Sequence, residues 1–242
     1  MDILFAPTPD GSTYLMWMLS GLSWTLLLWI LASIIAFPVG IVIGAMRTAP
    51  WRAIRLTGKL YVQIFRNIPL LVQVFLWYFI VPELLPIAYG DALKQLPPPW
   101  IGVICAIAGL GLYTSARVAE QVRAGVEALS PGQRGACSAL GLSVRAMYVH
   151  ILLPQALRIT LPTLTSEMLG LLKNTSVALT IGILEITSRA QQMNEFTFQT
   201  FTAFTCATVL YLLLALIVHF MAMLLEKRYS VPGLNLRPTR GH

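Results

Sequence analysis

Two segments of the chain place a basic side chain beside hydroxyl and amide groups in apolar sequence. In the first, Lys173 is followed by Asn174, Thr175 and Ser176. An ammonium group in this setting could bind a carboxylate, while its neighbours supply hydrogen bonds. The alternatives are a gating role and a structural partner, which would be Glu167 or a backbone carbonyl. A spacing of six residues puts Lys173 and Glu167 on nearly opposite faces of a helix, which argues against a pair within one helix.

The second segment consists of Tyr113, Thr114 and Arg117, and residues 113 and 117 are one helical turn apart. A planar guanidinium can bind a carboxylate through two hydrogen bonds. Arg117 also directly follows an apolar run, where a positive charge is favourable at a helix C-terminus and on the cytoplasmic side of a membrane. Both interpretations of Arg117 stay open at this point.

The elements that would position these side chains are membrane helices. Of the 242 residues, 57% are hydrophobic and 11% are charged, and the mean hydropathy is +0.73. These values exclude a soluble domain of average composition. Apolar runs of about 20 residues predict helices that cross a bilayer. Five such runs are expected, at 19–45, 68–85, 100–116, 161–184 and 201–225.

The fold class expected is therefore an all-α integral membrane protein with about five transmembrane helices, forming one domain over residues 1–242. Lys173 would lie about 12 residues, or roughly 18 Å, into the fourth run and near the bilayer midplane. An ionisable group at that depth is costly and suggests function.

The basic residues predict the orientation of the chain. Lys and Arg cluster between the first two runs, after the third run and in the C-terminal tail, whereas the opposite side of a five-span arrangement holds only Lys94 and Arg189. Short positively charged loops stay in the cytoplasm. This rule places the N-terminus outside and the C-terminus inside. The net charge of +7 follows from this bias, and no motif for nucleic-acid binding accompanies it.

The sequence offers no catalytic, metal-binding or cofactor-binding motif. It has no phosphate-binding loop, no HExxH and no nucleophile elbow, and its three histidines are scattered. Cys105, Cys137 and Cys206 form no CxxC pair. A transport pathway in such a chain must draw its energy from a gradient, a ligand or another subunit.

One polar stretch, about residues 119–157, interrupts the membrane sequence. Ser130-Pro131-Gly132 predicts a helix break, and a short helix is expected over 133–140. Gly141 can adopt the left-handed conformation that ends a helix, and Ser143 can cap the next one. Two short helices joined at a glycine would form a compact knob that fits a groove on another protein. An amphipathic loop on the lipid surface is the alternative.

The segment 133–143, followed by Ile151-Leu152-Leu153-Pro154, resembles the EAA coupling loop of binding-protein-dependent ABC importer permeases. Ala136, Gly141, Ile151, Leu153 and Pro154 match the pattern of that family. Two positions depart from it, since a glycine replaces the family glutamate and a cysteine replaces the second alanine. The residues that the resemblance assigns to coupling with an ATPase are Gly135, Ala136, Cys137, Leu140, Gly141, Leu142 and Ser143.

Further motifs narrow the resemblance to permeases for polar amino acids, and within them to glutamate/aspartate permease subunits. These motifs lie at 65–73, 112–125, 173–182 and 225–229, with further likeness at 81–86, 94–98, 165–168 and 231–234. The resemblance implies a type I importer domain in the bacterial inner membrane. An importer of the same family for glutamine or basic amino acids is one alternative, and an ATP-independent secondary transporter is another.

The resemblance also implies the partners of this chain. They are a cytoplasmic ATPase dimer, a second permease subunit that is a sister chain or an identical copy, a periplasmic amino-acid-binding protein and membrane lipid. ATP and Mg²⁺ would bind the ATPase, and this chain would bind no cofactor and hydrolyse nothing.

Overall fold

A computed structural model describes residues 2–229 of the chain, and every regular element in this range is a helix. The elements in chain order are η1 (Asp2–Phe5), α1 (Tyr14–Thr48), α2 (Arg52–Asn67), α3 (Leu70–Phe75), η2 (Leu76–Ile80), α4 (Val81–Leu84), α5 (Ile87–Lys94), α6 (Trp100–Glu127), α7 (Pro131–Ala139), α8 (Val144–Met147), η3 (Tyr148–Leu152), α9 (Leu153–Asn174), η4 (Thr175–Ile181), α10 (Ile186–Thr197) and α11 (Thr200–Tyr229). The sequence motif at 231–234 and the last two basic residues of the tail, Arg237 and Arg240, lie outside the described residues.

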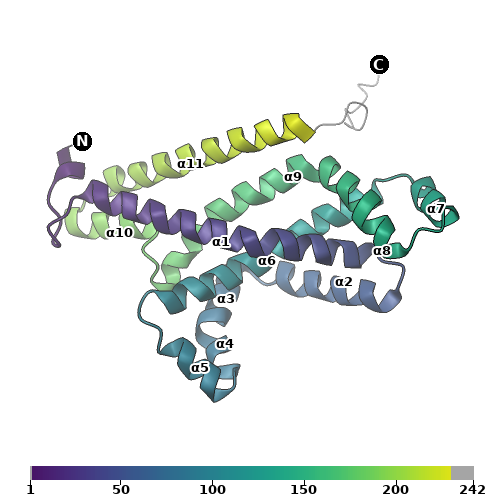
Figure 1. The fold of residues 1–242 in the computed structure, drawn as a ribbon. Coiled ribbons are helices and arrows are strands. Elements are labelled where there is room, and N and C mark those ends of the chain that lie inside the picture. The colour runs from purple at the N-terminus through teal and green to yellow at the C-terminus, as the bar shows by residue number, and fades with distance from the viewer. Residues whose placement is uncertain (1, 230–242) are drawn as a thin grey trace.

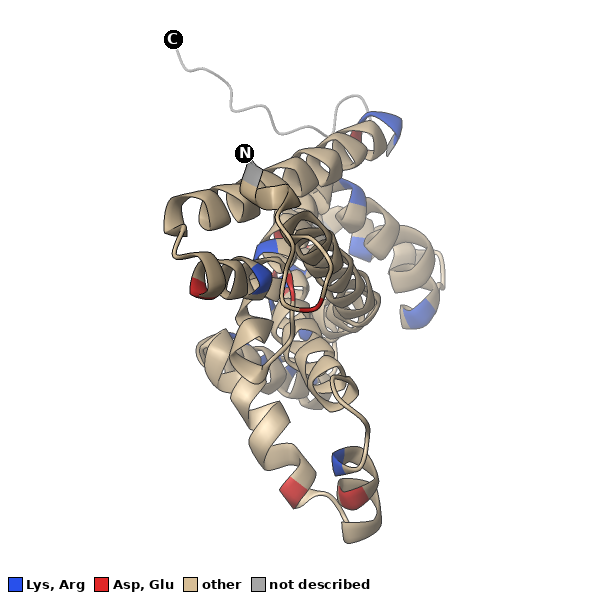
Figure 2. Cartoon of the chain, turned by 90° about the vertical axis from the view of Figure 1, so that its left-hand side faces the viewer, with Lys and Arg blue, Asp and Glu red and all other residues tan. Residues whose placement is uncertain are grey.

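The long helices run along one axis of the molecule (Figure 1). Helices α7 and α8 lie at one end of this axis, and the N-terminal segment and α10 lie at the other. The segment α3 to α5 projects to the side. Most of the ribbon in Figure 2 is tan, because few charged residues interrupt these helices. This distribution fits a chain whose surface faces lipid over most of its length.

Three helices, α1, α6 and α11, are each long and apolar enough to cross a membrane. Two bent pairs meet the same criteria, so the structure has up to five crossings. One pair joins 52–67 to 70–84 at a bend of 100°, and the other joins 144–181 to 186–197 at a bend of 50°. The all-α membrane fold is confirmed. The run expected at 68–85 begins after the sharp bend at Pro69, where the backbone leaves the helical conformation, and continues as α3, η2 and α4.

Close packing of α1 against α6 forms the centre of the molecule. A Cβ atom added to Gly40 would lie 2.5 Å from Val118 Cγ1, and one added to Gly44 would lie 2.7 Å from Val122 Cβ. Small residues at such positions let two membrane helices approach closely, which is how helices associate in lipid. The α6 helix therefore has a fixed position and rotation relative to α1.

The segment before α1 is held by a carboxylate. Asp10 accepts hydrogen bonds from the Thr8 and Ser12 hydroxyls and, at 2.9 Å, from Trp17 Nε1. These bonds favour the charged form, so the pKa of Asp10 lies well below its usual range. Arg189 of α10 stacks on the same Trp17 ring, 5.2 Å from its centroid. The N-terminal segment, the start of α1 and α10 are thereby joined at one end of the molecule.

Candidate functional site

Residues 131–147 form the knob expected from the sequence, which consists of α7, α8 and the turn between them. The Ser130 hydroxyl accepts a hydrogen bond from the Gly132 amide, and Pro131 is the first residue of α7. Proline suits this position because the first amide of a helix has no partner within the helix. The helix therefore begins two residues before the predicted Gln133, and the break in the chain falls before Pro131.

The turn between the two helices has the predicted geometry. Gly141 has φ +71°, in the left-handed region. Its amide donates to the Ser138 carbonyl, and the Leu142 amide donates to the Cys137 carbonyl at 3.1 Å. This pair of bonds is the Schellman motif. The Ser143 hydroxyl then accepts from the Ala146 amide and caps α8. Both local predictions, for Gly141 and for Ser143, are confirmed.

The predicted coupling residues divide between the surface and the interior of the knob. Leu140 is 78% exposed and Leu142 is 39% exposed, next to the exposed Gly141 and Ser143. Gly135 and Ala136 are also exposed, and an added Cβ at Gly135 would meet no atom within 4 Å. Cys137 differs from the rest because it is buried. Its side chain packs inside the knob.

Beneath the knob is an apolar cluster that connects it to the start of α9. Cys137 packs here as a small hydrophobe with residues of α6, α8, η3 and α9. The other buried members are Val126, Leu129, Met147, Tyr148, Leu152 and Ala156.

Two polar contacts connect the knob region to other helices. The Tyr148 hydroxyl donates to the Thr48 carbonyl at the end of α1, at 2.6 Å. The side-chain Nε2 of Gln133 donates to Gln155 Oε1 at 3.1 Å. A displacement of the knob would therefore act on both α1 and α9.

Arg117, one of the two cations singled out from the sequence, forms an ion pair between α6 and α9. Its Nε donates to Glu167 Oε2 at 2.6 Å, and its Nη2 lies 3.4 Å from Oε1. Gln121 Nε2 also donates to Glu167 Oε1, at 3.2 Å. The Glu167 side chain is 8% exposed and that of Arg117 is 45% exposed. Glu167, which the sequence offered as a structural partner of Lys173, is thus the partner of Arg117.

This arrangement corrects the helix-end interpretation of Arg117. The helix continues to Glu127, ten residues beyond Arg117, so no helix C-terminus lies nearby to favour the charge. The apolar run ends at Ala116, but the residues after it remain helical. Arg123 there pairs with Glu120 at 2.9 Å and with Glu127, at helical spacings of three and four residues. Arg47 of α1 also pairs with Glu120, which the sequence analysis did not anticipate.

Tyr113 and Thr114, the two residues expected to accompany Arg117, differ from each other in burial. Tyr113 is half-buried, one turn before Arg117. Thr114 is buried, and its hydroxyl has no hydrogen-bond partner among the described residues. Thr114 therefore faces the helix packing rather than the open side of Arg117.

Lys173, the second cation, lies on the exposed side of α9, one residue before its end. The ammonium group has no hydrogen bond or ion pair within residues 2–229. The Trp29 indole of α1 donates to the nearby Met168 carbonyl at 3.1 Å. This bond places the last part of α9 beside the middle of α1, which is the part of the chain expected inside the bilayer.

The residues after Lys173 offer fewer free hydrogen-bond donors than expected. The Thr175 hydroxyl donates to the Leu172 carbonyl at 2.7 Å and is fully buried. The Ser176 hydroxyl donates to the Lys173 carbonyl at 2.9 Å. Both hydroxyl protons are therefore used within the helix and are not available to a carboxylate. The half-buried Asn174 remains as the adjacent donor.

A buried carboxylate at the bend between residues 181 and 186 was missed from the sequence. Glu185 is fully buried, caps α10 by accepting from the Thr187 and Ser188 amides, and accepts from the Tyr211 hydroxyl at 2.6 Å. Its position directly before the helical stretch Ile186–Thr197 was the signal, because acidic residues favour helix N-termini. Every donor around it is internal to the fold, so its role is structural.

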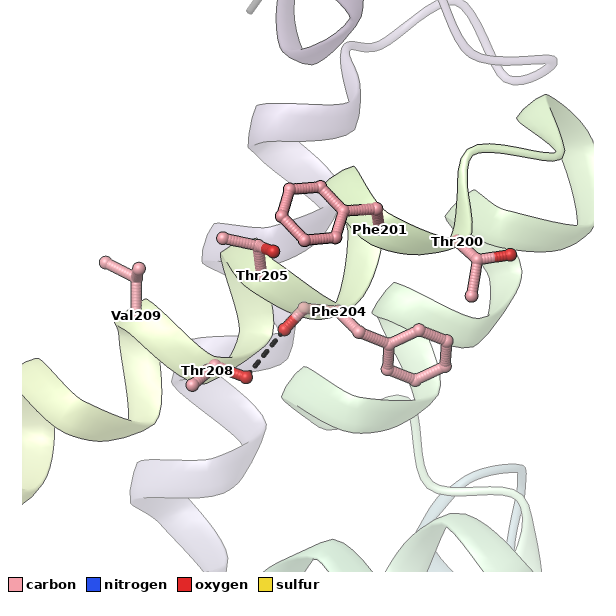
Figure 3. A pocket seen from close by; sticks show the side chains of 6 residues that line it. All are labelled: Thr200, Phe201, Phe204, Thr205, Thr208 and Val209. Atoms are coloured by element: carbon pink, nitrogen blue, oxygen red, sulfur yellow. Dashed lines mark hydrogen bonds between the residues drawn. The ribbon is translucent and has the colours of Figure 1, made fainter.

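A hollow on the outer side of α11 is lined by residues of that helix alone, as Figure 3 shows. Its residues are Thr200, Phe201, Phe204, Thr205, Thr208 and Val209. The Thr208 hydroxyl donates to the Phe204 carbonyl at 2.8 Å. A hollow with no second element around it cannot enclose a solute, so it does not define a substrate site.

The fold and the site together define a membrane-spanning domain with an exposed knob at one end. Charges lie inside the helix packing, a capped knob projects beyond it, and polar contacts connect the knob to two long helices. Residues 36–231 match the model of one family, described as the binding-protein-dependent transport system inner membrane component.

The chain belongs to this family. It is 40% identical over 233 residues to the glutamate/aspartate import permease protein GltJ of Escherichia coli K12, with 96% of this chain and 95% of that protein covered. It is 32% identical to the probable glutamine ABC transporter permease protein GlnM of Bacillus subtilis, with 82% and 88% covered.

A solved structure supports the same assignment. The crystal structure of an amino acid ABC transporter with histidines matches at a TM-score of 0.72 and 29% identity, covering 89% of this chain and 95% of that one. An inward-facing structure of the MetNI methionine ABC transporter matches at a TM-score of 0.66 and 17% identity, with 89% and 98% covered, which supports the fold alone. The protein is therefore a multi-pass inner-membrane permease of the ABC importer type.

Proposed function

We propose that this chain is a permease subunit of an ATP-driven importer for glutamate and aspartate. Similarity to GltJ over almost the whole length of both proteins is the observation that carries the substrate assignment. Glutamine is the second candidate, because the chain also resembles GlnM. In the proposed orientation the N-terminus is periplasmic and the C-terminus is cytoplasmic, which puts α7 and α8 at the cytoplasmic end.

The complete importer would contain two permease chains, identical or sister subunits, two cytoplasmic ATPases and a periplasmic binding protein. ATP and Mg²⁺ would bind the ATPases, and this chain would bind no cofactor. Leu140, Gly141 and Leu142, exposed at the tip of the knob, are the proposed contact with the ATPase. Closure of the ATPase dimer would move the knob and, through the Tyr148 contact with Thr48, the end of α1.

The chemistry of the two cations favours Lys173 as the substrate contact. Arg117 already donates to Glu167 through Nε and Nη2, so a substrate carboxylate that used these two nitrogens would have to break a partly buried ion pair. The Lys173 ammonium has no partner within the described residues and lies on an exposed side of α9. A carboxylate-bearing amino acid would supply the missing charge, with Asn174 as a neighbouring donor.

The coupling role is tested by a Gly141→Trp variant in the assembled complex. Gly11→Trp is a matched control, because Gly11 also has a positive φ, +80°, and also has open space around an added Cβ, but lies at the opposite end of the molecule. We expect Gly141→Trp to lose co-purification of the ATPase while Gly11→Trp retains it. Equal ATPase recovery with both variants would contradict the proposed contact.

The substrate role is tested separately by glutamate uptake with Lys173→Gln and Lys173→Arg variants. We expect the neutral variant to raise the KM at least about tenfold, since a charge-assisted hydrogen bond contributes about 1.5–3 kcal/mol. The Arg variant should keep most of the uptake. A KM unchanged by Lys173→Gln would exclude this residue from substrate binding and leave the coupling role untouched.

A further inference from the structure

Helix α2 occupies a segment that the sequence analysis treated only as a basic connection between two spans. Three of its basic residues, Arg52, Arg55 and Lys59, are spaced at i, i+3 and i+7. At about 100° per residue this spacing puts all three within about 60° of one another around the helix. All three side chains are exposed. They form a stripe along one side of α2, here called the basic stripe.

The rest of α2 has two further faces. Gly58 and Val62 are buried and face α1 and α6. Beyond the basic stripe, Leu56, Leu60 and Ile64 follow one another at intervals of four residues and are about half exposed, at 51%, 50% and 54%. The helix therefore has one packed face, and the cationic and apolar faces beside it are uncovered in this chain.

The depth of the basic stripe follows from its contacts with α1. The apolar run 19–45 is centred on residue 32, and half of a hydrocarbon core of about 30 Å corresponds to about ten residues of helix. The edge of the hydrocarbon is thus expected near residue 42. Gly58 lies against Ile43, Met46 and Arg47, and Arg55 Nη1 donates to the Ala49 carbonyl at 3.3 Å. The basic stripe lies at the level of the lipid headgroups.

The charge of the basic stripe is not balanced within the chain. Helix α2 contains no Asp or Glu. Arg66, at its other end, lies 3.8 Å from Glu120, which already pairs with Arg47 and Arg123. Within residues 2–229, Arg52 and Lys59 have no hydrogen bond or ion pair. Three neighbouring cations on one side of α2, spread over about 10 Å of helix, therefore lack an anion.

We propose that the basic stripe is a binding site for the phosphate groups of anionic phospholipids. A lipid satisfies both free faces at once, because its headgroup lies at the level of Arg52, Arg55 and Lys59 and its acyl chains lie at the level of Leu60 and Ile64. A soluble acidic protein could neutralise the charges but would leave the apolar face uncovered. Trp51, 54% exposed at the start of α2, has the position of an interfacial aromatic residue.

The site binds lipid independently of which amino acid the protein transports, so it stands even if the substrate assignment fails. The proposed orientation decides only which leaflet supplies the lipid. Polybasic segments next to membrane helices gain affinity for an anionic surface with each Lys or Arg, by a factor of about five per residue. Neutralising all three residues of the basic stripe should reduce the preference for anionic lipid by up to about 100-fold.

The test is native mass spectrometry of the full chain, purified in detergent and titrated with phosphatidylglycerol or with phosphatidylcholine of the same acyl chains. We expect the wild type to retain phosphatidylglycerol preferentially. The variant Arg52→Gln/Arg55→Gln/Lys59→Gln should lose this preference. The charge-preserving variant Arg52→Lys/Arg55→Lys/Lys59→Arg should keep it.

A matched control removes the same number of charges at the same end of the molecule, through Arg134→Gln/Arg145→Gln/Arg158→Gln, and should keep the preference. The proposal is overturned if the wild type binds both lipids equally or if the control loses as much preference as the basic-stripe variant. It is also overturned, in favour of a protein partner, if the basic-stripe variant keeps its lipid preference but no longer co-purifies with the ATPase.

Discussion

Replacing Arg117 with Gln should destabilise the protein by about 3 kcal/mol. The Glu167 side chain is 8% exposed, and Arg117 is the cation that balances it. Removing one partner of a buried ion pair typically costs about 3–5 kcal/mol, because the remaining charge is left uncompensated. The lower end applies here, since Arg117 is itself 45% exposed and Gln121 would still donate to Glu167.

The cost should largely disappear in the double variant Arg117→Gln/Glu167→Gln, in which two neutral amides face each other. The free energy of unfolding, measured by detergent denaturation of the purified protein, would then give a coupling energy of about 2–3 kcal/mol between the two positions. Arg158→Gln is the control, because this exposed arginine of α9 has no ion pair within residues 2–229, and it should change stability by less than about 0.5 kcal/mol.

Measurements of glutamate uptake distinguish a structural role of Arg117 from a role in substrate binding. If Arg117 only fixes α6 against α9, the double variant should regain glutamate uptake with a nearly normal KM. A purely structural role of Arg117 would be refuted if the Arg117→Gln variant kept its stability but had a raised KM, and if the second substitution did not restore uptake. That result would make Arg117 a substrate ligand.

Three further predictions concern other parts of the fold. Gly40→Ala should lower the free energy of unfolding by about 1–3 kcal/mol, because the new Cβ would lie 2.5 Å from Val118 Cγ1. Thermal unfolding in detergent compares this variant with Gly170→Ala, which has open space around the new Cβ and should not disturb packing. Gly135→Ala should stabilise α7 by about 0.5–1 kcal/mol, because alanine favours the helix and its Cβ would meet no atom within 4 Å. Slower amide hydrogen exchange in α7 would show this stabilisation, whereas unchanged exchange would argue against the helix. The pKa of Asp10 is lowered by its hydrogen bonds, so the stability that Asp10 contributes is present above the ordinary carboxyl pKa of about 4 and is lost as pH falls through the lower folded-state value. The hydrogen-exchange protection factors of residues 3–13, corrected for the intrinsic exchange rate at each pH, should therefore not change between pH 7 and pH 4.5, and a loss of protection over that interval would contradict the lowered pKa.

The knob could be predicted from the sequence because its determinants are local. A left-handed glycine and a serine cap each act over a few residues, and Gly141 and Ser143 lie in one short turn. Pro131 was expected to break the chain before the helix and is instead its first residue. The burial of Cys137 was not visible in the motif, because it depends on packing against α6 and α9.

The ion pair between Arg117 and Glu167 could not be predicted, because it joins residues fifty positions apart through the rotations of two helices. The helix-end interpretation of Arg117 was wrong for a different reason. Apolarity marks the part of a helix that lipid surrounds, and this helix continues as a charged segment up to Glu127. Helix α2 was overlooked for the same reason, although the spacing of Arg52, Arg55 and Lys59 is helical and would have revealed it.

The most direct test of the proposed function is uptake of labelled glutamate, with histidine and glutamine as comparisons, into proteoliposomes that contain this chain, its second permease and the ATPase. Binding protein is added outside, and ATP is either enclosed or omitted. We expect glutamate uptake that requires ATP and exceeds uptake of the other two amino acids. Uptake of glutamine or histidine alone would keep the importer and reject the acidic substrate, whereas uptake that persists without ATP would contradict the account.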